Sequence, residues 1–169
     1  VIGIFLVGMV ALLVSNTAQL MQEIASERIA QEVKITQEHL AEIQKALTVD
    51  VSFTASSVPF VQAVGRRSAD AVNELIVGAN KSLEMDDIDV FDGDGNHLTG
   101  LDTSADKNTA QPAELATALK GSTSSGVKVY DAAGASVLSI SSTAPVTSLR
   151  QSTVLGAVQM SRQINDAFL

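Results

Sequence analysis

The chain has 169 residues with a formal net charge of −8, and its hydrophobic content of 46% suffices for one ordinary core. The acidic balance and an aromatic content of 4% argue against nucleic acid as a partner, because phosphates need a basic surface and bases stack on aromatic rings. The absence of cysteine and the wide separation of the two histidines, His39 and His97, exclude disulfides, iron–sulfur clusters and a structural zinc site, so no metal or cofactor is expected.

Residues 1–22 are apolar and predict a transmembrane helix. The run VIGIFLVGMVALLV is uncharged and the first charged residue is Glu23, so about twenty residues match the hydrocarbon thickness of a bilayer. A signal peptide and a buried core helix are the alternatives, but the sequence continues as helix without a turn signal and is apolar on all sides. Glu23 and Glu27 precede the first basic residue, Arg28, which favours the outer side of the membrane. We therefore expect membrane lipid as a partner, and a periplasmic or extracellular domain anchored in the inner (cytoplasmic) membrane.

Residues 23–57 predict a long signalling and dimerisation helix. No Gly or Pro occurs between Ala25 and Val51, and most residues there are good helix formers. Apolar or small residues recur at alternating steps of four and three, as a narrow heptad seam of Ile29, Val33, Thr36, Leu40, Ile43 and Leu47. Such a seam suits a homodimer through this helix, and plain packing against a sheet is the alternative.

Two shorter helices are expected after the long one. Pro59 disfavours helix in the residue before it and suits the first turn of the helix that follows. This second helix should stop near Gly65, and a third should run from about Ser68 to Ser82.

Five strands are expected after these helices. The first, IDVFD, alternates in polarity and meets DGDGN, a strong hairpin signal, before the returning strand HLTGL. A short helix from Pro112, capped by Gly121, precedes three strands within 125–132, 135–146 and 152–162. Residues 163–169 are expected to begin an exit helix toward a second membrane span. The order predicts an α+β fold, in which the long helix covers one face of a five-stranded antiparallel sheet.

The order and spacing of four runs in this half resemble a known family: IDVFDGDGNHLTG, ALKG, VLSISSTAPV and VLGAVQMSRQIND. Together they are similar to a single Cache domain, the PAS-like extracytoplasmic sensor of bacterial chemotaxis receptors and sensor kinases. The resemblance covers about Leu40 to Asp166, with the sensor domain itself at 58–162. It implies a PAS-like sheet and ligand sensing in a transmembrane receptor, first of all a methyl-accepting chemotaxis protein. A histidine kinase or diguanylate cyclase sensor is the alternative within this class, and a dimerisation module without a small ligand is the alternative outside it.

In this family a small molecule binds on the sheet, beneath the loop after the second strand. By that resemblance the candidate ligand-binding residues are His97, Thr99, Asp102, Lys107, Lys128, Tyr130, Ser139, Ser141 and Thr143. Ser139, Ser141 and Thr143 have one parity and share a face of their strand, as Lys128 and Tyr130 do on theirs. If those faces point inward, hydroxyls and an ammonium group suit a small polar or anionic metabolite, an organic acid or an amino-acid-like molecule. The alternative is that the hydroxyl row is a solvated face.

Three sequence features argue against a dicarboxylate site, a calcium loop and a catalytic site. The citrate and C4-dicarboxylate sensors of the family carry arginines where this chain has His97 and Ser141, and a histidine where it has Gly100, so a dicarboxylate ligand is not expected. Asp92, Asp94 and Asn96 have calcium-loop spacing, but the sixth and twelfth positions lack the required Gly and Glu, so we expect a plain hairpin turn. The sequence lacks the nucleophile-elbow, Walker and zinc-protease motifs, and no catalytic activity is expected.

Overall fold

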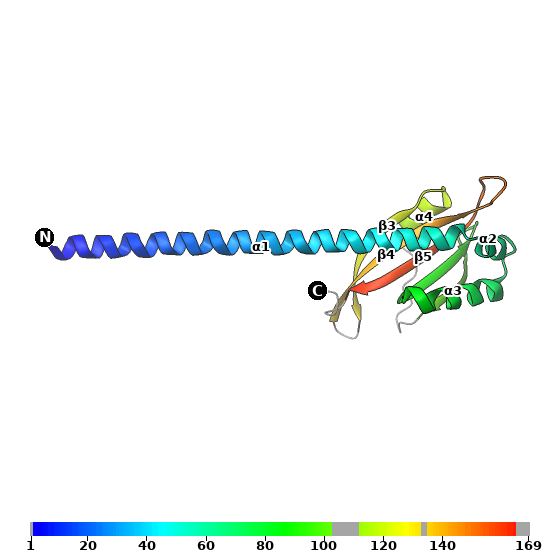
Figure 1. Cartoon of the computed structure of the whole chain (residues 1–169), viewed down its shortest axis with the longest axis horizontal. Coiled ribbons are helices and arrows are strands. Elements are labelled where there is room, and N and C mark those ends of the chain that lie inside the picture. The colour runs from blue at the N-terminus through cyan, green and yellow to red at the C-terminus, as the bar shows by residue number, and fades with distance from the viewer. Residues whose placement is uncertain (1, 103–111, 133–134, 165–169) are drawn as a thin grey trace. The chain divides into compact units, whose positions relative to one another are not determined.

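A computed structural model of the chain describes the backbone of residues 2–102, 112–132 and 135–164, and the side chains within 26–101, 112–129 and 137–164. The helices are α1 (Ile2–Ser56), α2 (Val58–Gly65), α3 (Ala69–Leu83) and α4 (Pro112–Leu119). The strands are β1 (Asp87–Asp92), β2 (His97–Asp102), β3 (Ser124–Ala132), β4 (Ala135–Thr147) and β5 (Val154–Ile164) (Figure 1). The chain divides into two compact units, Val1–Ala41 and Glu42–Leu169, and the second unit holds the sheet.

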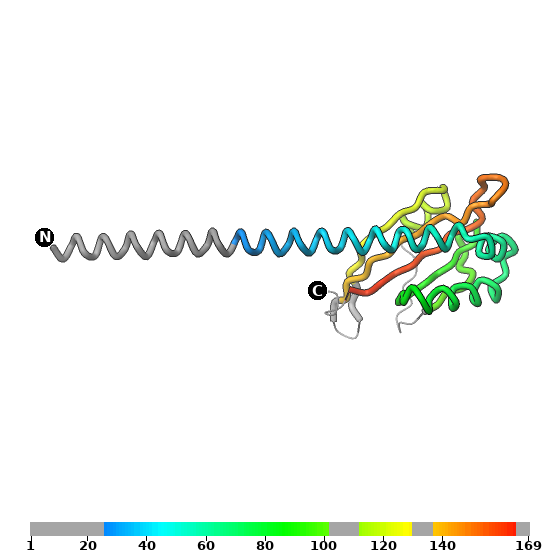
Figure 2. The backbone as a smooth tube through the Cα atoms, viewed as in Figure 1, coloured from blue at the N-terminus to red at the C-terminus, as the bar shows by residue number. Residues whose placement is uncertain are grey.

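The five strands form one antiparallel sheet in the order β2-β1-β5-β4-β3. The two long strands β4 and β5 run side by side near its middle (Figure 2). Ser161 of β5 is paired with Ser141 on one side and with Asp87 on the other. Because directly paired residues point to the same side, these three side chains share one face. The expected α+β fold with a five-stranded antiparallel sheet is confirmed.

One face of the sheet carries the apolar core of the second unit. Ile88, Val90, Ile140, Val158 and Met160 are fully buried there, at alternate positions of their strands. The helices that cover them contribute residues at helical spacing: Leu47, Val51 and Ala55 of α1, Phe60 and Val64 of α2, and Val72 and Ile76 of α3.

The opposite face is covered in part by α4. Ser139, Ser141 and Thr143 of β4 are at most 4% exposed on this side, while Ile140 and Ser142 are fully buried on the other. Residues 139–144 of β4 are therefore buried on both faces. The interpretation of the hydroxyl row as a solvated face is wrong, because α4 lies against β3, β4 and β5 and removes the row from water.

Two expected segments differ from the structure or fall outside it. Gln163 and Ile164 do not begin an exit helix, since they pair with β4 as the last residues of β5. Residues 165–169 lie outside the described part, as do the side chains of residues 1–22, where the transmembrane helix is expected.

From residue 26 onward, no single described helix combines the length and apolarity of a membrane span. Ser26–Ser56 of α1 and α2 meet that requirement only as a pair bent by 65°, on length and composition alone.

Candidate functional site

The hydroxyl row of β4 surrounds a buried carboxylate from α4. Glu114 lies in the first turn of α4 and is only 5% exposed. The Ser141 hydroxyl donates to it at 3.1 Å from Oε1 and 2.9 Å from Oε2. The Thr143 hydroxyl and the Gln159 side-chain amide donate to Oε2 at 3.3 Å and 3.2 Å. Since burying a charge without such partners is costly, these donors are what hold Glu114 against the sheet.

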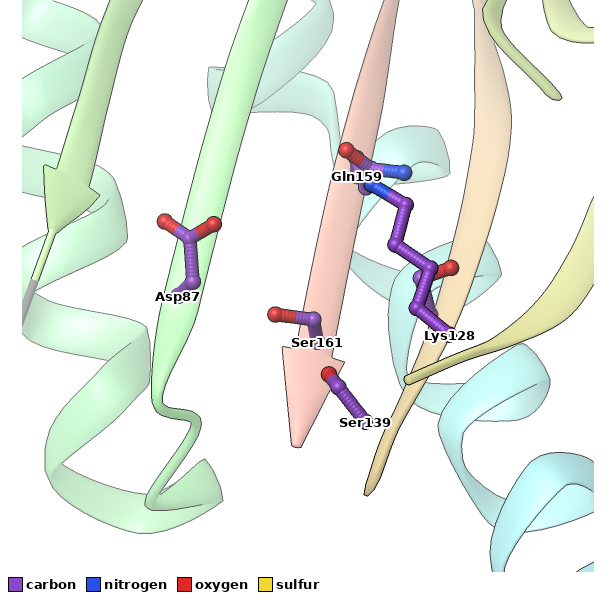
Figure 3. Close-up of a pocket in the computed structure, with 6 residues that line it drawn as sticks. Asp87, Lys128, Ser139, Gln159 and Ser161 are labelled. Carbon is purple, nitrogen blue, oxygen red and sulfur yellow. The ribbon is translucent and has the colours of Figure 1, made fainter. Parts of the chain in front are cut away.

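Beside this cluster lies a small polar hollow, drawn in Figure 3. Its lining comes from four strands: Asp87 of β1, Lys128 of β3, Ser139 and Ser141 of β4, and Gln159 and Ser161 of β5. It leaves about 10 Å³ for the centre of a water molecule, which is room for roughly one water. The hollow lies over the central strand β5 and shares Ser141 and Gln159 with the Glu114 cluster.

The hollow has charges of both signs on its walls. Asp87 lies on one side of β5, and the Lys128 side chain reaches over from the other side to the Gln159 amide, with Ser161 on β5 between the two strands (Figure 3). The lining thus combines an acidic and a basic side chain with an amide and hydroxyl groups.

A second polar pair lies on the same face, nearer the edge of the sheet. His97 Nε2 lies 2.7 Å from Asp89 Oδ1, and the His97 ring packs edge-on against Phe91 with 5.5 Å between ring centroids. A Cβ at Gly100 would lie 2.5 Å from Asp89 Oδ1 and 3.1 Å from His97 Nε2. Glycine at this position therefore leaves room for the pair, where a larger side chain would displace it.

The structure brings together four of the nine predicted ligand-binding residues. Lys128, Ser139 and Ser141 line the hollow, and Thr143 contacts Glu114 beside it. His97 lies on the same face but pairs with Asp89 instead.

The other four candidates do not join this group. Thr99 lies on the opposite face, because a register shift between Val90 and Phe91 pairs it with the buried Val90. The side chains of Asp102, Lys107 and Tyr130 lie outside the described residues.

Sequence reasoning missed Asp87, Glu114, Gln159 and Ser161. Glu114 precedes Ala118 by four residues and so shares a helix face with a small buried residue, which is a signal that it points toward the protein. Gln159 and Ser161 are alternate residues of β5 and so point to the same side of the sheet. Only their pairing with Thr143 and Ser141 shows that this is the side on which Glu114 lies.

The Asp92–Asn96 turn is a hairpin turn, as expected. Asp92 Oδ1 accepts hydrogen bonds from the backbone N–H groups of Asp94 and Asn96, and Gly95 adopts a positive φ of 82°. Arg67 of the α2–α3 connection pairs with both Asp92 and Asp94, at 3.5 Å and 2.5 Å. Burial alone would raise the pKa of Asp92, but the hydrogen bonds from Asn96 and Asp94 and the charge of Arg67 outweigh it and lower the pKa.

Comparison with known proteins identifies the fold. No family model matches the chain, and no curated protein matches it. The chain is similar to the sensor domain of the V. cholerae histidine kinase DctB, with a TM-score of 0.61 and 17% identity over 83% of this chain and 56% of that one. It is similar to the periplasmic domain of Vibrio cholerae LuxQ, with a TM-score of 0.56 and 19% identity over 76% of this chain and 62% of that one.

The E. coli DcuS sensor domain is similar as well, with a TM-score of 0.54 and 13% identity over 74% of this chain and 91% of that one. The chain thus spans less than two thirds of the LuxQ and DctB domains. At these identities the likeness concerns the fold: this chain has the PAS-like α+β fold of periplasmic sensor domains, and the resemblance found in the sequence is confirmed at that level.

Proposed function

We propose that this chain is the extracytoplasmic ligand-sensing part of a transmembrane signal-transduction receptor. The observation that carries the proposal is the polar hollow over β5, whose lining converges from four strands of a sheet with the fold of periplasmic sensor domains. The space among the described residues holds about one water, so its polar lining fits one polar or charged group of a small metabolite, such as an organic acid or an amino-acid-like molecule. The role is binding rather than catalysis, in keeping with the lack of catalytic motifs in the sequence.

The proposed receptor is anchored by the apolar segment at residues 1–22 in the cytoplasmic membrane, with the sheet outside it. Its output is a methyl-accepting chemotaxis module by our first interpretation. A histidine kinase output fits as well, because one similar structure is the sensor domain of such a kinase. Reading any coding sequence downstream of Leu169 would distinguish a chemotaxis module from a kinase or cyclase.

The proposed signal starts at β5. Gln159 and Ser161 line the hollow, so a ligand there acts directly on β5, whose last residue, Ile164, is three residues after Ser161. A ligand shifts the receptor only as far as its affinities for the two signalling states differ.

Binding is tested by thermal unfolding of the chain with a panel of organic acids and amino acids. A rise in the midpoint with at least one compound, lost in Lys128→Gln and Ser161→Ala, is the expected result. Lys120→Gln is the matched control, because it removes the same charge from an exposed lysine just after α4. No shift with any compound, together with a tight dimer, would favour the dimerisation module.

A further inference from the structure

The groups around Glu114 make a carboxylate-binding site by their own geometry. Ser141 and Thr143 are alternate residues of β4, and Gln159 is the partner of Thr143 on β5, so all three project from one patch of the sheet. Their donors converge on a single carboxylate at 2.9–3.3 Å. The same donors in the same places would hold the carboxylate of a small molecule.

We infer that Glu114 fills this carboxylate-binding site from within the chain, and thereby restricts the adjoining hollow to ligands that present an ammonium group to the sheet. Glu114 belongs to the chain, so its effective concentration beside the donors exceeds that of any free carboxylate. Glu114 is only 5% exposed, so a free anion in solution has little access to the donors that Glu114 occupies.

The charges around the hollow lead to the same ligand class. Ser141 and Gln159 are shared between the hollow and the Glu114 cluster, so a bound molecule lies next to the Glu114 carboxylate. Among the described residues of the lining, Asp87 adds a second carboxylate and Lys128 supplies an ammonium group. A dianion would face two like charges, whereas a small amine or an amino-acid-like zwitterion places its ammonium group toward them. This ligand class rests on the proposed sensing function; the site that Glu114 fills does not.

The internal site is tested by chemical rescue. Glu114→Ala leaves the donors without their carboxylate and opens space for a free one. Sodium acetate, at tenfold excess over its dissociation constant, should raise the unfolding midpoint of this variant by about 3–6 °C relative to chloride of equal ionic strength. Wild type and Glu114→Gln, in which the site stays filled, should show no such difference.

A cavity control separates rescue from a general salt effect. Val72→Ala opens a cavity at a fully buried apolar position in α3 and should not respond to acetate. If Glu114→Ala does not fold in chloride, the comparison is made by refolding it in acetate or in chloride, and recovery in acetate alone is expected. An equal unfolding midpoint, or an equal refolding yield, of Glu114→Ala in acetate and in chloride would overturn the internal carboxylate-binding site.

The ligand class is tested by calorimetry with glycine, ethylamine and succinate as probes. The dissociation constant of wild type for succinate should be about tenfold or more above that for the better of the two ammonium probes. In Glu114→Ala this ratio of dissociation constants should become smaller or fall below one. Tighter binding of succinate by wild type would overturn the ligand class and leave the sensing function standing. Absence of binding by all three probes would overturn the ligand class and count against sensing, while the acetate result would still decide the internal site.

Discussion

The hydroxyl groups of Thr48 in α1 and Ser142 in β4 lie 3.3 Å apart, on the face of the sheet opposite the hollow. Ser142 is followed and preceded along β4 by Thr143 and Ser141, which hold Glu114 on the other face. Strand β4 therefore connects the Glu114 cluster with the C-terminal part of α1 through adjacent residues. A displacement of β4 that changes the contacts on one face also changes those on the other.

Thr48→Val is expected to lower the free energy of unfolding by about 1 kcal/mol, the usual net value of one partly buried hydrogen-bonding group. Thr36→Val is the matched control. Both hydroxyls donate to the carbonyl four residues earlier, but Thr36 is exposed in the unit Val1–Ala41 and Thr48 also contacts the sheet. Urea unfolding measures both variants, and an equal loss in the two would show that the sheet contact contributes nothing.

Gly156→Ala is expected to lower the free energy of unfolding of the second unit by about 2 kcal/mol, a typical cost of overpacking. A Cβ at Gly156 would collide with the backbone carbonyl oxygen of Phe91 and lie 2.9 Å from Val64 Cγ1, so neither β1 nor α2 has room for it. Gly78→Ala is the control, because Gly78 lies in helix α3 and a Cβ at this position has no neighbouring atom within 4 Å. That variant should gain up to about 1 kcal/mol by helix propensity. Thermal unfolding of both variants checks the opposite signs, and a neutral Gly156→Ala would contradict the close packing of α2 on β5.

Stability should fall in acid partly through Asp92. Its pKa is lowered in the folded chain from the ordinary value of 3.8, so its contribution is present above that value and is lost as the pH falls through the folded pKa. Asp92→Asn should therefore lower stability at neutral pH and flatten the decline of stability below about pH 4. Arg67→Gln leaves the hydrogen bonds from Asn96 in place, so it should reduce the decline of stability in acid only in part. Urea unfolding from pH 7 to pH 3 measures these slopes, and an unchanged slope in Asp92→Asn would contradict the assignment.

The heptad seam of α1 is proposed to form a homodimer. Ile29 and Val33 are 61% and 49% exposed in the single chain, and a charge there should dissociate a coiled-coil partner. Sedimentation of Ile29→Glu and Val33→Glu should show monomer at concentrations where wild type is dimeric. Ile35→Glu is the matched control, since Ile35 is 66% exposed but lies off the seam. Monomeric wild type, or equal dissociation by Ile35→Glu, would rule out this interface.

Most of the local structure could be predicted from the sequence. Pro59 and Gly65 bound α2 as expected, and the alternation in IDVFD and the turn residues at Asp92–Asn96 predicted β1, β2 and the hairpin between them. These features depend on backbone preferences and on spacing within a few residues, which a single chain segment carries by itself.

The candidate site was only half predictable. Parity placed Ser139, Ser141 and Thr143 on one face of β4, but parity alone did not tell whether that face was solvated or covered. The register shift between Val90 and Phe91 removed Thr99 from the group, and such an irregularity depends on the pairing of two strands rather than on either one.

By itself, the sequence determined the α+β class and most of the helices and strands, but not the end of β5, because periodicity and turn chemistry are local properties. The tertiary structure alone decided that α4 covers the hydroxyl row, that Glu114 is the charge buried there, and that Asp87 and Lys128 face the same hollow. The physical reason is that these groups come from segments far apart in the chain, and only the pairing of β5 with both β1 and β4 brings them onto one face.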